Sequence, residues 1–140
     1  MPVTTIPFKV HRATRNPNTG VSTVTDMSGL IGLDDDGVVL QYRVKTSQVG
    51  GWPVPAPTES DLRVVRIPLA AVRRAELRRH WFRTRLVLAA ADLRAFEPLH
   101  PWLTGSELAL TIPRAERSGA ADLASSVELA LSTRLLSSGG

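Results

Sequence analysis

Arginine is the residue whose number and spacing predict chemistry in this chain. Of 17 basic residues in the 140, 15 are arginine, and eight of these fall between Leu62 and Arg85 with Glu76 as the one acid among them. The rest of the chain carries nine basic and twelve acidic residues, a net charge of −3. A guanidinium group holds a carboxylate or a phosphate through a planar pair of N–H donors. This segment therefore predicts a surface for an anionic partner.

The arginines of this segment lie on a predicted β-hairpin. Residues 73–90 alternate between apolar and polar side chains along two arms that meet at a corner, Trp81–Phe82, as a half-buried antiparallel pair does. The residues expected to face the core are Ala75, Leu77, Leu86 and Leu88. The residues expected on the opposite face, as the anion-binding set, are Arg74, Arg78, His80, Arg83 and Arg85. Val87 shares that outward parity, and Glu76 is expected to neutralise one of the charges.

The arginines could also be present without serving a partner, for either of two reasons. Abundant Ala, Leu and Arg with almost no Lys is what a GC-rich coding sequence produces, so the total by itself does not indicate a partner. The alternative is that water and salt screen these exposed charges and that the patch has no partner. A nucleic-acid-binding module is not expected, because Trp81 and Phe82 are the only aromatic residues interleaved with these arginines.

The residues that usually carry catalysis or hold a metal are absent or scattered. The chain has no cysteine, and His11, His80 and His100 stand far apart without a carboxylate at ligand spacing. No nucleophile elbow, zinc-binding helix motif or glycine-rich phosphate loop occurs. The three acids of Asp34–Gly37 are typical of a tight hairpin turn, because a calcium loop needs alternating ligands. We therefore expect no cofactor, no metal and no enzymatic activity.

One alternative of a different class remains. A small-ligand or enzymatic domain would need a pocket at the mouth of the predicted barrel, with Trp52 and Trp81 beside it. A deep pocket with convergent polar groups would favour this alternative, whereas a barrel interior filled with apolar side chains would favour a binding module.

Length and composition predict one domain, residues 1–140, in the cytoplasm. A chain of this length can bury a core without a metal or a disulfide, and the lack of cysteine is typical of a reducing compartment. The sequence shows no signal peptide and no apolar run of about 20 residues that would span a membrane. The partners expected are therefore an acidic protein, an anionic membrane surface, or a second copy joined through a sheet edge.

The periodicity of the chain predicts a mainly β domain with one C-terminal α-helix. Strand patterns cover residues 5–12, 30–34, 38–45, 62–67, 73–80, 83–90 and 107–113, with a weaker pattern over 21–27. Residues 46–60 hold three prolines and two glycines and are expected to form a flexible loop. From residue 118 the period changes to 3.6, which predicts an amphipathic helix over 118–136 with Ser118 as its N-cap and with Leu123, Val127 and Leu131 packed on the sheet.

Several stretches resemble the bacterial pleckstrin-homology-like (PH-like) and GRAM-like domains. They are Ile67-Pro68-Leu69-Ala70-Ala71-Val72, the run Trp81 to Leu88, Asp92–Leu93 with Pro101–Trp102, and Glu107 to Leu110 followed by a helix. The resemblance spans about Gly29 to Leu136. It implies a partly open barrel of about seven antiparallel strands capped by the helix. The function that we expect of such a domain here is a non-catalytic binding or scaffolding module, which docks a protein or an anionic surface through a sheet edge or the arginine-rich hairpin. Lys9, Arg12 and Arg15 lack the spacing of the inositol-phosphate motif, so that ligand is not implied.

Overall fold

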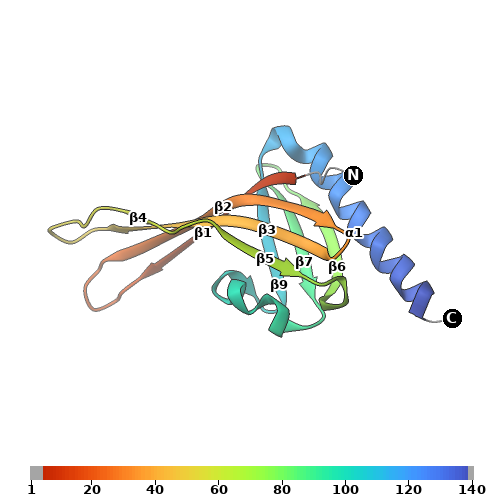
Figure 1. Cartoon of the computed structure of the whole chain (residues 1–140). Coiled ribbons are helices and arrows are strands. Elements are labelled where there is room, and N and C mark those ends of the chain that lie inside the picture. The colour runs from red at the N-terminus through yellow and green to blue at the C-terminus, as the bar shows by residue number, and fades with distance from the viewer. Residues whose placement is uncertain (1–4, 139–140) are drawn as a thin grey trace.

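A computed structural model of the chain describes residues 5–138, with side chains up to Arg134, as one antiparallel sheet followed by a helix (Figure 1). The strands are β1 (Thr5–Arg15), β2 (Ser22–Asp34), β3 (Gly37–Val49), β4 (Thr58–Glu59), β5 (Arg63–Ile67), β6 (Val72–Arg79), β7 (Thr84–Ala90), β8 (Leu103–Thr104) and β9 (Glu107–Ile112). Three 3₁₀ helices, η1 (Leu69–Ala71), η2 (Leu93–Trp102) and η3 (Arg114–Glu116), precede α1 (Arg117–Ser138).

The predicted fold class is confirmed: the domain is mainly β, with one α-helix in the described chain, at its C-terminal end. The strand order is β4-β3-β2-β1-β9-β7-β6, while β5 pairs with β3 and β8 pairs with β9. Neither β4 nor β5 pairs with β6 within residues 5–138, so the strongly curved sheet does not close. An antiparallel sheet of this kind buries one face and leaves the other to solvent.

Alternating side chains fill the concave side of the sheet. The core-facing residues follow a period of two along most strands, as in Ile6 and Phe8, or Leu108 and Leu110, whereas β7 is buried at every position from Leu86 to Ala90. The hairpin follows the same rule, because Ala75, Leu86 and Leu88 are buried and Leu77 packs against the core. Phe96 and Leu99 of η2 and the inner side of α1 complete the same cluster. The interior of the curved sheet is therefore filled with apolar side chains.

The first three strands are longer than the sequence pattern predicted, and they extend beyond the core as an arm (Figure 1). Residues 22–34 form the single strand β2 rather than two segments. The predicted bounds of the loop, 46 and 60, are both wrong, because Thr46–Val49 continue β3 and Thr58–Glu59 form β4. Continuous pairing of β2 with β3 from Ser22 to Asp34 explains the difference, because the ladder holds polar residues that show no alternation.

The turn between β2 and β3 is closed by its first aspartate. The Asp34 carboxylate accepts hydrogen bonds from the backbone N–H groups of Asp36 and Gly37 at 2.9 and 3.1 Å. Gly37 has a φ of 137°, which favours glycine at the corner. Hydrogen bonding from Asp36 N–H, together with Arg66 at 2.5 Å, lowers the pKa of Asp34. This carboxylate therefore closes a turn, as the sequence predicted.

The C-terminal helix lies against β6 and the end of the sheet (Figure 1). Leu123 and Val127 are buried, and Leu131 packs against the same cluster, which confirms the predicted stripe. The predicted start of the helix is wrong. Helix α1 begins at Arg117 directly after η3, so Ser118 lies inside the first turn and does not cap it.

The helix also covers the edge of the sheet at β6. The backbone N–H of Ala75, which β7 does not use, donates to Glu128 Oε1 at 2.9 Å. An open strand edge offers unpaired N–H groups to other chains, and a covered edge does not. Self-association through a sheet edge stays a prediction, and the stretch of β6 beside Glu128 is not the edge that would serve it.

We expect Leu123→Ala to lower the free energy of unfolding by about 2–4 kcal/mol, because it leaves a cavity between α1 and the sheet. Leu129 lies on the same helix and is 69% exposed, so Leu129→Ala is the matched control and should change stability by less than about 0.5 kcal/mol. Urea unfolding of both variants measures the difference. Equal, small losses would mean that the helix is not part of the core.

Glu128→Ala should cost about 1 kcal/mol, because the N–H of Ala75 would lose its acceptor in a partly buried place. Glu128→Gln keeps an acceptor oxygen, so it should cost less. Thermal unfolding of the two variants measures the loss of stability, and hydrogen exchange of the Ala75 amide reports on the hydrogen bond itself. Faster exchange in the Ala variant alone is the expected result, and unchanged exchange in both would contradict the edge-covering role.

Candidate functional site

The predicted anion-binding residues belong to the convex face of β6, β7, β9 and β1, which we call the outer face. Strand register places the side chains of this face in rows across the sheet. One row runs Arg78, Arg85, Thr111 and Lys9, and the next rows run Glu76, Val87 and Ala109, then Arg74, Ala89 and Glu107. Cross-strand neighbours on one face lie about 4.5–5.5 Å apart at Cβ. The rows therefore bring three cations of separate strands into line, with carboxylates in the neighbouring rows.

Two arginines of the predicted set form a closed ion-pair network. Arg78 donates two hydrogen bonds to the Glu107 carboxylate, at 3.0 and 3.4 Å, and also lies 3.5 Å from Glu76. Arg74 lies 3.7 Å from Glu76 and 3.8 Å from Glu107. Two positive and two negative groups thus face one another. Hydrogen bonding to Glu107 raises the pKa of Arg78, so the guanidinium keeps its charge within the network.

This network corrects one expectation. The sequence predicted Glu76 as the one neutralising acid, but Glu107 from β9 is a second, and together they balance both Arg74 and Arg78. Val87 has the outward parity that the sequence predicted, yet it is only 3% exposed on the outer face. It stands in register between Glu76 and Ala109, where the long side chains of the network cover it.

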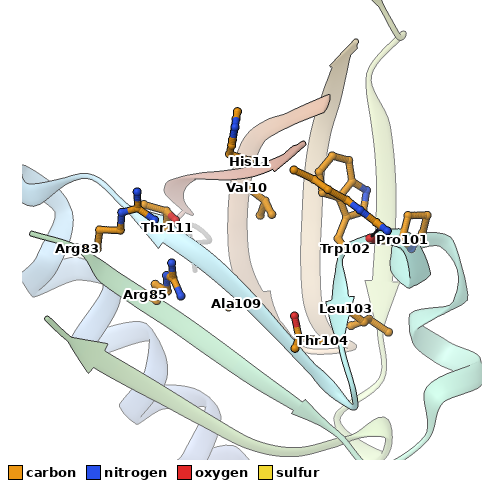
Figure 2. A pocket seen from close by; sticks show the side chains of 11 residues that line it. Val10, His11, Arg83, Arg85, Pro101, Trp102, Leu103, Thr104, Ala109 and Thr111 are labelled. Carbon is orange, nitrogen blue, oxygen red and sulfur yellow. Dashed lines mark hydrogen bonds between the residues drawn. The ribbon is translucent and has the colours of Figure 1, made fainter. Parts of the chain in front are cut away.

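The other two arginines of the set line a groove on the outer face (Figure 2). The groove measures about 530 Å³, and Arg83 and Arg85 stand on one side of β9 while Trp102 and Pro101 stand on the other. The small side chains of Ala109 and Thr111 make its floor. The full lining, which we call the seam groove, is Val10, His11, Arg12, Arg83, Arg85, Pro101, Trp102, Leu103, Thr104, Ala109 and Thr111.

The seam groove exists because β1 leaves β9 soon after the two strands meet. In the described chain β1 pairs with β9 at Lys9 opposite Thr111, while β8 pairs with the same edge of β9 at Leu108 and Glu107. The edge of β9 between these points lies open, and Ala109 lines the groove there. Along an antiparallel strand, successive residues turn their N–H and C=O groups to opposite sides. Ala90 donates to Ser106, so Ser106 and every second residue after it on β9 turn these groups toward β7. Ala109 lies between two such residues, and its N–H and C=O groups therefore point into the open stretch.

Arg12 bridges the opposite wall and adds a third guanidinium. Its Nη1 donates to the carbonyl oxygen of Pro101, which joins β1 to the end of η2. His11 beside it is paired with Asp26 at 2.6 Å. Arg12, Arg83 and Arg85 make no ion pair with the side chains described for residues 5–134. The groove therefore gathers three cations without a carboxylate of the described chain to balance them.

The structure thus divides the predicted site residues into three groups. Arg74 and Arg78 lie in the ion-pair network, Arg83 and Arg85 line the seam groove, and His80 is exposed at the corner of the hairpin. The sequence pattern gave no indication of Arg12 and Glu107. Both lie on strands far from the hairpin in the sequence, and the order in which β1 and β9 join the sheet brings them beside it.

The tryptophans expected at a pocket mouth do not cover one. Trp52 and Trp81 are 93% and 94% exposed, and they lie on the loop between β3 and β4 and on the corner between β6 and β7. Trp102, half-buried at the end of η2, is the tryptophan that lines the seam groove. The rings of Trp52 and Trp81 are instead presented to solvent.

Metal sites and membrane-spanning helices find no support in the described chain. Within residues 5–138, no three His, Asp or Glu side chains lie close enough to hold a metal ion. The same part of the chain contains no helix that is long and apolar enough to cross a membrane. No family model, no curated protein and no solved structure matches the chain. Function therefore has to be inferred from the geometry of the outer face.

The network predicts which arginines are free to bind. We expect Glu107→Gln to leave one positive charge of the Arg74 and Arg78 pair unbalanced, because Glu76 still lies beside both. Retention on heparin should therefore strengthen, with a salt dependence that is steeper by about one unit. Glu59→Gln on β4 changes the net charge equally but frees no arginine, and it serves as the control. The same shift in both variants would show that net charge alone, and not the network, sets retention.

Proposed function

We propose that the protein is a non-catalytic binding module with a PH-like fold, which docks an anionic partner through the seam groove and the arginines of its hairpin. The observation that carries this proposal is the meeting of Arg12, Arg83 and Arg85 around one groove without a balancing carboxylate in the described chain. The neighbouring arginines, Arg74 and Arg78, have such carboxylates. The contrast supports a selective use of the groove rather than a general excess of charge.

The fold supports a binding role in two ways. A curved antiparallel sheet followed by a C-terminal helix is compatible with the PH-like type that the sequence resembles. Its interior is filled by apolar side chains of the strands, η2 and α1, so a ligand would bind at the surface. Binding residues on a rigid scaffold of this kind are pre-organised, because their strands are fixed by the core.

The chemistry of the groove suits a carboxylate or a phosphate. A guanidinium pairs with either anion through two parallel N–H donors, and Arg83 and Arg85 present two such groups from one wall. The hydroxyl groups of Thr104 and Thr111 add donors from the other wall and the floor. The repulsion between the unbalanced arginines also falls when an anion lies between them. The partner is therefore expected to carry clustered acidic or phosphate groups.

The proposal is tested by reversing the two groove charges. Arg83→Glu with Arg85→Glu should fold like the parent and lose on the order of tenfold or more in affinity for heparin or an acidic peptide, since each charge-assisted hydrogen bond contributes about 1.5–3 kcal/mol. The matched control is Arg43→Glu with Arg63→Glu, on β3 and β5, which alters net charge equally on exposed residues away from the groove.

Retention should be measured over a range of salt concentrations. The parent and the control should bind in parallel and release as salt rises, because the contacts are ionic. The groove variant should be released at much lower salt. Equal loss in both double variants would overturn the proposed site, since it would mean that the total charge and not the groove holds the partner.

A further inference from the structure

The corner of the arginine-rich hairpin, residues 79–83, presents two aromatic rings that pack on nothing in the described chain. Trp81 and Phe82 are each 94% exposed. The backbone N–H of His80 donates to the carbonyl oxygen of Arg83 at 2.7 Å, which closes the corner and holds both residues outside the ladder. We call this segment the hairpin tip. Its apolar surface is held away from the core by a tight turn.

Two arginines flank these rings in the sequence. Arg79, His80 and Arg83 are all exposed, and residues 79–83 contain no acid. Arg79 and Arg83 make no ion pair with the described side chains. Behind the tip, the row of Arg85, Thr111 and Lys9 continues the positive charge on the outer face. The tip therefore combines exposed aromatic surface with unbalanced positive charge.

This combination fits the surface of an anionic bilayer. Tryptophan and phenylalanine rings enter the boundary between headgroups and acyl chains, where water leaves their apolar surface. Arginine side chains at the same depth bond lipid phosphates, and anionic lipids attract each nearby cation further. A soluble polyanion would satisfy the arginines but would leave the two adjacent rings in water, whereas a bilayer accepts both the rings and the arginines.

We propose that the hairpin tip docks on an anionic lipid bilayer, with Trp81 and Phe82 in the headgroup region and with Arg79 and Arg83 on lipid phosphates. This inference rests on the proposed anion-docking function and names its partner. The seam groove, which shares Arg83 with the tip, then faces the same bilayer, so that Arg85 lies near the headgroups that surround the inserted rings.

The chain supplies its own control for exposed aromatic surface. Trp52 is 93% exposed and Val54 is 52% exposed, on a loop whose residues 50–57 carry no charged side chain. If exposed rings alone bound membranes, this loop would serve as well as the hairpin tip. If the rings need the flanking cations, only the tip would serve. Trp52→Ser with Val54→Ser is therefore matched to Trp81→Ser with Phe82→Ser.

The experiment is cosedimentation with vesicles of phosphatidylcholine alone and of phosphatidylcholine mixed with phosphatidylserine. The parent should bind only the mixed vesicles, with a blue shift of its tryptophan fluorescence and quenching by lipids brominated near the headgroup. The tip variant should bind at least about tenfold more weakly, which corresponds to about 1.4 kcal/mol, and should lose the shift. The Trp52 variant should bind and shift like the parent.

The outcomes separate this inference from the proposed function. If the tip variant binds mixed vesicles like the parent, or if the parent binds heparin but no vesicle, the membrane inference is overturned while anion docking stands. Both variants keep their arginines, so their retention on heparin should equal that of the parent. If the Arg83→Glu, Arg85→Glu variant keeps full retention on heparin, the proposed function itself is wrong, whatever the vesicles show.

Discussion

Strand alternation governs both faces of this sheet. The strands β6, β7 and β9 place alternate side chains in the apolar core, and the side chain between two inward ones has to face outward. A slip of one residue would exchange the two faces, so the core holds the register of the outer face. The positions of the arginines are thus a consequence of where leucine, isoleucine and alanine pack. The charged surface takes its geometry from the core behind it.

That register explains why the arginine-rich hairpin is not uniformly basic at its surface. Arg74 and Arg78 alternate with Glu76 on β6, and Glu107 enters the same face from β9. The four groups balance one another and shield Val87 and Ala89 from water, which gives their methylene stems a structural role. Exposed ion pairs of this kind contribute little to stability singly. Their larger effect is to remove two arginines from the surface that a partner can use.

The unbalanced charge lies where the sheet is incomplete. Because β1 diverges from β9 beyond Lys9, the outer face is hollowed there, and Arg12, Arg83 and Arg85 stand around the hollow. The hairpin extends past this point and ends in the tight corner that carries Trp81 and Phe82. Along the hairpin, the ion-pair network of Arg74 and Arg78 is therefore followed by the arginines of the seam groove and then by the aromatic residues of the hairpin tip. A single docking event on an anionic bilayer would use the last two together.

Local spacing was enough to predict most of the elements, because hydrophobic periodicity is a signal between near neighbours in the chain. The hairpin with its corner at Trp81–Phe82, the turn at Asp34–Gly37 and the inner stripe of α1 all follow from it. The ends of β2, β3 and α1 do not, because strand pairing and the preceding 3₁₀ turn extended polar stretches that lack a pattern. Which arginines are free depends on tertiary contacts. Glu107 and Arg12 reach the hairpin through the strand order β1-β9-β7-β6, and contacts between residues distant in the chain leave no trace in local periodicity.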